Sequence, residues 1–244
     1  MHEGIGEHPV WRVPLLGTVH SDTILTTWIV MAISLLCFAW LGSSYRSVRK
    51  VRRTQATFEG IVTWLGDLAI GTIGRHGERF APVFVSLFFF IFLLNQVGFL
   101  PFKQLGMPFG GSPTADINTT VAYALIVFFG IWIYAISIKG LGAFKHLVQP
   151  FWPMAPINVL EELARPITLS LRLFFNIFVG ELLLFVIASV IASGVKIGAL
   201  DLSLLATVGP ILIQFFNFFI GTLQAFVFTL LSIVYLALAT AEDH

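Results

Sequence analysis

Two ionisable side chains, Arg172 and Glu181, stand inside a long apolar stretch of the sequence. A charge at the centre of a membrane-spanning helix costs about 2.5 to 3.5 kcal/mol, so such residues are rarely kept without a use. On one helix these two point about 180° apart, which excludes a simple ion pair between them. The structural alternatives are an ion pair of Arg172 with a carboxylate on another span, and a protonated Glu181 buried for packing. The first lacks a partner, because the other apolar stretches contain no Asp or Glu.

A polar stripe runs along the last apolar segment. Five residues at helical offsets of 0, 3, 7, 10 and 21 fall within about 80° of one another: Gln214, Asn217, Gly221, Gln224 and Tyr235. On the preceding helix Thr168, Arg172 and Asn176 share a second stripe, with Arg165 one turn before it. Amides in such places can simply hold helices together. Beside Arg172 and Glu181, the stripes favour a hydrated pathway.

The composition places these residues in a membrane. Of 244 residues, 57% are apolar and only 11% are charged, whereas a soluble domain carries about 25% charged residues. A net charge of +1 without a basic stripe excludes nucleic acid as a partner. The single cysteine, Cys37, excludes an internal disulfide, and the six histidines lie outside the apolar runs without ligand spacing. We therefore expect no metal site, no cofactor and no catalytic residue.

Five apolar runs approach the roughly 20-residue length that crosses a bilayer. They cover residues 24–41, 80–100, 121–138, 166–193 and 202–240. Between the first two runs the apolar spacing predicts an amphipathic surface helix over residues 57–74, the alternative being a loop with chance periodicity. The polar first 23 residues are expected to be irregular and, without signal-peptide features, to remain on the mature chain. The expected fold is an all-α polytopic membrane protein with a single domain, residues 1–244.

Basic residues predict the orientation, because they concentrate on the cytoplasmic side of a membrane. With the amino terminus outside and the carboxyl terminus in the cytoplasm, ten basic residues lie inside and three outside. The last two helices are too long for an upright crossing, since residues 166–193 and 210–238 would measure about 42 and 43 Å against a core near 30 Å. They are expected to tilt by about 45° if straight, and to lean against protein or water.

The motifs around Arg172 are specific. Residues 165–181 read Arg-Pro-Ile-Thr-Leu-Ser-Leu-Arg-Leu-Phe-Phe-Asn-Ile-Phe-Val-Gly-Glu, and Pro-Ile-Asn-Val-Leu-Glu ends at Glu161 just upstream. Asp116-Ile-Asn-Thr-Thr and Leu-Gln224-Ala-Phe, with Tyr235 near the end, complete the pattern. In order and spacing, over essentially the whole chain, this pattern resembles subunit a of F-type ATP synthases, the stator subunit beside the rotating ring of c subunits.

The resemblance implies a mechanism and a set of partners. Two offset aqueous half-channels lead protons to and from the rotor, and the subunit is not catalytic by itself. Its partners are the c-ring, b-type peripheral stalk subunits, the rest of the ATP synthase and membrane lipid, in a bacterial inner membrane. Arg172 matches the family's essential arginine, which draws a c-ring carboxylate into its ionised form and repels a cation that would pass directly between the half-channels.

The resemblance also implies roles for the other polar residues. Glu181, Asn217 and Gln224 match the outer half-channel, with Asp116 and Asn118 at its mouth; Asn176 matches a pathway asparagine; Thr168 and Glu161 lie on the cytoplasmic side; and Gln214 and Tyr235 are further half-channel candidates. Two positions depart from the family. Phe175 stands where many members have Gly, so that packing against the neighbouring helix must differ. Asn217 stands where some have His, so that a water chain beside Glu181 must replace a titrating group.

Other functions are weighed against this one. A Na⁺-translocating subunit stays open, because in this family the c-ring chooses the ion, and ring size and direction of operation are equally undetermined. A secondary transporter is expected to show paired repeats and interrupted helices in matching halves, which the chain lacks. A membrane-embedded enzyme needs paired metal ligands or a nucleophile beside a base, and neither arrangement is found.

Overall fold

The computed structural model describes residues 10–13, 17–44, 53–74, 77–98, 113–140, 142, 144, 152–192 and 202–240. Six α-helices make up most of these residues: α1 (Ser21–Ser44), α2 (Arg53–Ile73), α3 (Gly77–Val97), α4 (Ile117–Lys139), α5 (Ala155–Ala192) and α6 (Leu202–Thr240). All except α2 are long and apolar enough to cross a membrane. Helices suit this setting because they satisfy every interior backbone hydrogen bond within one segment. The expected all-α polytopic fold with five membrane-embedded helices is confirmed.

A β-hairpin precedes the first helix. Strand β1 (Val10–Val13) pairs antiparallel with β2 (Gly17–His20), with Val10 opposite His20 and Val13 opposite Gly17. The expectation that the first 23 residues are irregular is therefore wrong for this stretch. Its polar character hid a local content of Val, Trp and Thr, which are residues that favour strands.

The amphipathic helix predicted over residues 57–74 is α2, which begins slightly earlier. Leu65 and Ala69 are fully buried, whereas Glu59 and Asp67 on other faces are exposed. The ring of Phe58 stacks on Phe89 of α3 with the centroids 4.6 Å apart. Because one apolar side packs on α3 and the charged side stays open, the periodicity reflects a true helix.

Of the two longest helices, only α5 departs from its predicted bounds. Helix α6 keeps its predicted range, residues 202–240, and continues through Pro210 without interruption. Helix α5 begins at Ala155, well before Pro166, at which the predicted span began. A proline removes only one backbone hydrogen bond, and a transmembrane helix tolerates the loss. At 1.5 Å per residue both helices measure about 57 to 58 Å, nearly twice the hydrocarbon thickness.

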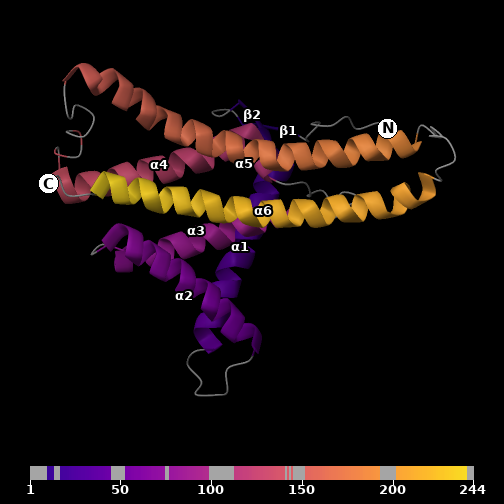
Figure 1. Ribbon diagram of the computed structural model, residues 1–244, viewed down its shortest axis with the longest axis horizontal. Coiled ribbons are helices and arrows are strands. Elements are labelled where there is room, and N and C mark those ends of the chain that lie inside the picture. Colours follow the sequence, from indigo (N-terminus) through magenta and orange to yellow (C-terminus); the bar gives the residue numbers. More distant parts are fainter. Residues whose placement is uncertain are drawn as a thin grey trace.

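The helices form one elongated bundle. Figure 1 shows α3, α4, α5 and α6 running broadly along the longest axis, while α1 crosses them. Helix α6 packs against α3, α4 and α5, and α2 packs against α3 and α6. One buried apolar cluster joins all six of these helices through side chains that include Val30, Leu65, Ile91, Ala124, Leu173 and Phe228. This core fixes which sides of α5 and α6 face each other and which stay open.

Candidate functional site

Arg172 lies on the open face of α5. Its neighbours Leu169 and Leu173 are buried in the bundle, whereas Arg172 itself is exposed. Thr168, Arg172 and Phe175 follow one another on this exposed side. Within the described residues, no carboxylate forms an ion pair with Arg172. The guanidinium is therefore a cation turned away from its own subunit and set among exposed apolar residues.

Phe175 shares that exposed side. Its side chain is 53% exposed, and its ring meets Phe174 of the same helix edge to face at 5.3 Å. The phenylalanine thus projects from the open face of α5.

Glu181 lies on α5, nine residues after Arg172 and directly after the buried Gly180. Nine residues correspond to about 13.5 Å along the axis and half a turn of rotation, so the two positions lie on opposite sides of the helix. The Glu181 side chain is outside the part of the chain that the structure describes.

Asn217 of α6 fills the space beside Gly180. A Cβ atom at Gly180 would lie 2.6 Å from Asn217 Oδ1, so a larger residue at position 180 would require the Asn217 side chain to shift. The Asn217 side chain is 5% exposed, and its Nδ2 has no hydrogen-bond partner among the described residues. One turn away, Asn176 Nδ2 donates to the carbonyl oxygen of Ile220 at 3.4 Å. The structure therefore brings Asn176, Gly180 and Asn217 together between α5 and α6.

Gln224 continues the polar side of α6 two turns further. It is 6% exposed, and its Nε2 also has no hydrogen-bond partner in the described part of the chain. Gln214 lies one turn before Asn217 and is partly buried. Asn217 and Gln224 thus place two amide NH₂ groups about 10 Å apart along one helix side. A buried NH₂ group without a partner costs free energy unless water reaches it.

Two amides of α3, which the sequence analysis did not select, meet the same part of α6. Asn95 Nδ2 donates to the carbonyl oxygen of Gly221 at 3.0 Å, and Asn95 Oδ1 accepts from Thr114 Oγ1 at 3.0 Å. Gln96 Nε2 donates to the Phe218 carbonyl oxygen at 3.2 Å and to Thr222 Oγ1 at 3.3 Å. An Asn-Gln pair inside a Phe-rich run is the signal that would have found them. Helices α3 and α5 therefore both contact the same turn of α6.

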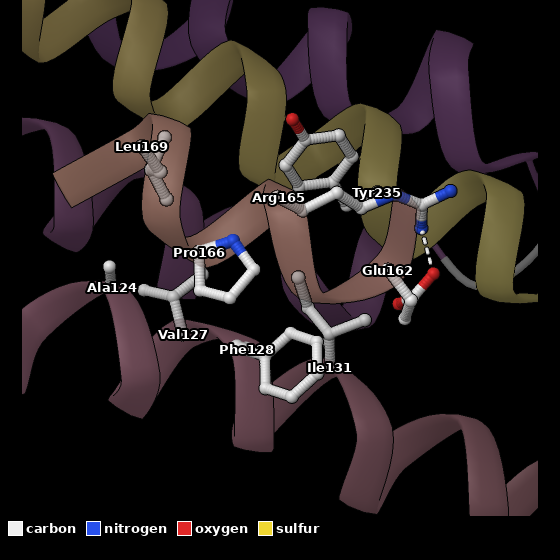
Figure 2. A pocket seen from close by; sticks show the side chains of 9 residues that line it. All are labelled: Ala124, Val127, Phe128, Ile131, Glu162, Arg165, Pro166, Leu169 and Tyr235. Atoms are coloured by element: carbon white, nitrogen blue, oxygen red, sulfur yellow. Dashed lines mark ion pairs between the residues drawn. The ribbon is translucent and has the colours of Figure 1, made fainter. Parts of the chain in front are cut away.

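A second polar cluster, apart from the first, joins α4, α5 and α6. Figure 2 shows most of its side chains. Arg165 Nη1 forms an ion pair with Glu162 Oε2 at 2.8 Å, and the guanidinium carbon lies 5.0 Å from the ring centroid of Tyr235. Trp132 Nε1 donates to Glu162 Oε1 at 3.2 Å. Glu162, Arg165 and Tyr235 border a small pocket that is also lined by Pro166 and Leu169.

The cluster changes the expected grouping of two candidates. Tyr235 contacts Arg165 and lies about 27 Å along α6 from Asn217, so the two share a stripe but not a site. Glu161 is 69% exposed at its side chain and lies 3.7 Å from Arg165, whereas its neighbour Glu162 is buried. The sequence analysis chose Glu161 and did not consider Glu162. Helical spacing to Arg165 alone admits both, at i+4 and i+3.

The remaining candidates have local partners. Asp116 caps α4 by accepting a hydrogen bond from the Asn118 backbone N–H at 2.9 Å, and the Asn118 side chain is exposed. Thr168 Oγ1 donates to the carbonyl oxygens of Ala164 and Arg165 on its own helix. The Asp116 bond caps the start of α4, and the Thr168 bonds satisfy its hydroxyl group. Neither requires a contact with the two clusters.

Comparison with known proteins shows the family of the chain. The family model described as ATP synthase A chain matches residues 24–237. The chain belongs to the ATP synthase A chain family. It is also 33% identical over 246 aligned residues to ATP synthase subunit a of Desulforamulus reducens, with 96% of this chain and 88% of that protein covered. The resemblance that the motifs around Arg172 carry is confirmed. The chain is a component of the membrane sector of the ATP synthase and a multi-pass membrane protein.

Proposed function

We propose that this chain is the proton-conducting stator subunit of an F-type ATP synthase and forms two offset half-channels against the c-ring. The observation that carries the proposal is Arg172, an exposed cation without an ion pair among the described residues, on an apolar helix face. A guanidinium in an apolar setting is stabilised by an anion. A carboxylate arriving on the c-ring supplies that anion, loses its proton in the field of Arg172 and then moves on.

The outer half-channel is assigned to the turn at which α3, α5 and α6 meet. Asn217 and Gln224 support this assignment, because their buried NH₂ groups have no protein partner in the described residues and require water as a partner in an apolar bundle. Asn176 lies in the same contact, and Glu181 follows Gly180 on α5. Gln214 continues the stripe on one side, with Asp116 and Asn118 at the mouth.

The inner half-channel is assigned to the opposite end of α5. Glu161 is exposed there, with Thr168 between it and Arg172 along the helix and Tyr235 on α6 nearby. The amino terminus lies outside a bacterial inner membrane and the carboxyl terminus in the cytoplasm, on the ratio of basic residues. The b-type subunits of the peripheral stalk hold the chain against rotation. The chain itself carries out no catalytic step.

Arg172 separates the two half-channels. A proton that crossed directly would dissipate about 2.3 kcal/mol per charge per 100 mV, so the fixed positive charge protects the coupling. Ions must therefore travel around with the rotor.

The test uses the purified complex reconstituted into liposomes and driven by an acid-to-base jump. The expected result is ATP synthesis in sodium-free buffer that a protonophore abolishes and a sodium ionophore leaves unchanged. Synthesis that requires a sodium gradient would contradict proton conduction and favour the sodium-conducting version. Absence of synthesis under both gradients, with ATP hydrolysis by the complex intact, would contradict the proposed function.

A further inference from the structure

Helix α5 carries two arginines on nearly the same side. Arg165 and Arg172 are seven residues apart, which corresponds to about 20° of rotation and about 10.5 Å along the axis. They are the only Lys or Arg residues of α5, and α6 has none. Sequence alone therefore offers two equivalent cations to any anion that approaches this stretch of α5.

The structure treats the two arginines differently. The Arg165 side chain is 16% exposed, pairs with Glu162 at 2.8 Å and lies over the Tyr235 ring. Arg172 is exposed, and no carboxylate of the described residues pairs with it. A cation held by a carboxylate and an aromatic face has little of its field left for a third group.

Glu162 is itself held in place. Trp132 of α4 donates to Oε1, which leaves Oε2 directed at Arg165. Both oxygens of this buried carboxylate are thus engaged, one by a neighbouring helix and one by the arginine. Figure 2 shows Glu162 and Arg165 joined by the ion pair, with the Tyr235 ring beside the guanidinium stem. The carboxylate belongs to a site built from α4, α5 and α6.

We infer that Glu162, oriented by Trp132, neutralises Arg165 and confines it to this chain, so that Arg172 alone is presented to carboxylates at the open face. The inference rests on the proposed function, because the competing anion is the carboxylate of the rotor. Without Glu162, a second cation one heptad away would hold a passing carboxylate ionised after it leaves Arg172 and would delay its reprotonation. Glu162 is a positioning residue that acts through Arg165.

The experiment compares Glu162→Gln with the double variant Glu162→Gln/Arg165→Gln. Glutamine at position 162 keeps an oxygen that accepts from Trp132, so Glu162→Gln removes the negative charge at nearly constant shape, and Arg165→Gln then removes the positive charge. Proton-driven ATP synthesis is measured in membrane vesicles and divided by the amount of assembled complex, determined by immunoblot. Glu59→Gln, at an exposed glutamate of α2, is the matched control for loss of one negative charge.

The expected result is a loss of roughly fivefold for Glu162→Gln, typical of residues that modulate coupling through others. The double variant should recover at least half of that loss, because the released cation is gone. A purely structural ion pair makes the opposite prediction, since the double variant also lacks the contact with Tyr235. Normal synthesis by Glu162→Gln, or a double variant no better than the single one, overturns the inference. Arg172→Ala is assayed in parallel: normal synthesis by that variant contradicts the proposed function itself rather than the role of Glu162.

Discussion

Gly180 of α5 lies directly against Asn217 of α6, so closely that a Cβ atom at position 180 would fall 2.6 Å from Asn217 Oδ1 and 2.9 Å from Nδ2. This contact sets the spacing of the two long helices at the point proposed for the outer half-channel. It also holds the Asn217 amide next to the backbone that leads to Glu181. Changes at Gly180 therefore act on the helix contact and on the amide together.

Gly180→Ala should destabilise the contact by about 1 to 3 kcal/mol, because a methyl group overpacks a filled space. The midpoint of thermal unfolding of the purified complex measures the loss. Gly60→Ala is the control, since nothing lies within 4 Å of a Cβ atom at that helical glycine. Adding Asn217→Ala to Gly180→Ala should restore much of the lost stability, as it removes the atoms that the methyl group meets. Equal midpoints for Gly180→Ala and Gly60→Ala would show that the two helices are not in contact there.

A disulfide between positions 180 and 217 tests the same contact chemically. Cysteines at both positions, in a Cys37→Ser background, should cross-link rapidly under mild oxidation, because the Cβ atoms lie within the range of a disulfide. Gly180→Cys combined with Phe215→Cys is the control, since Phe215 is 72% exposed and faces away. Cross-linking is read as a mobility shift that a reductant reverses. Faster cross-linking of the control pair would contradict the observed rotation of α6.

Silver-ion reactivity reports whether the amide side of α6 is hydrated. Cysteine at Asn217 or Gln224 should react with Ag⁺ and lose proton conduction, because the native side chains have buried NH₂ groups without protein partners in the described residues. Cysteine at Ile233 is the control, as that side chain is fully buried among apolar neighbours on the same helix. Protection at Asn217 and Gln224 equal to that at Ile233 would indicate dry packing.

Asn95 is predicted to be structural. Asn95→Leu removes the hydrogen bonds to the Gly221 carbonyl oxygen and from the Thr114 hydroxyl, each worth about 0.5 to 1.5 kcal/mol. A lower unfolding midpoint and less assembled complex are expected. Ser86→Ala is the control, because Ser86 is exposed and its hydroxyl donates to the Pro82 carbonyl oxygen of its own helix. An Asn95→Leu complex as stable as Ser86→Ala would argue against the hydrogen bonds between α3 and α6.

Length and polarity predicted the helices well, because a membrane-spanning helix is specified by its own composition. They predicted a helix start at Pro166, but α5 continues through this proline, a residue that usually ends a helix in a soluble protein. They also did not predict the β-hairpin of residues 10–20. The position of a charge deep within a predicted membrane span likewise identified Arg172 as a candidate functional residue. Contacts between helices could not be predicted from length and polarity. Which of Glu161 and Glu162 is buried, for example, depends on how α5 is rotated against α4. Attention to charges alone also missed Asn95 and Gln96, whose amides are neutral but equally unable to stay unpaired in an apolar bundle.

The central claim is that Arg172 couples ion flow to rotation, and ATP synthesis by Arg172→Ala vesicles under an imposed proton gradient tests it most directly. Assembly should be nearly normal, because the side chain is exposed and makes no ion pair within the described residues. ATP synthesis should fall to the background of vesicles treated with a protonophore, since no charge then ionises the arriving carboxylate or blocks direct passage. An assembled Arg172→Ala complex that synthesises ATP at the wild-type rate would contradict the account.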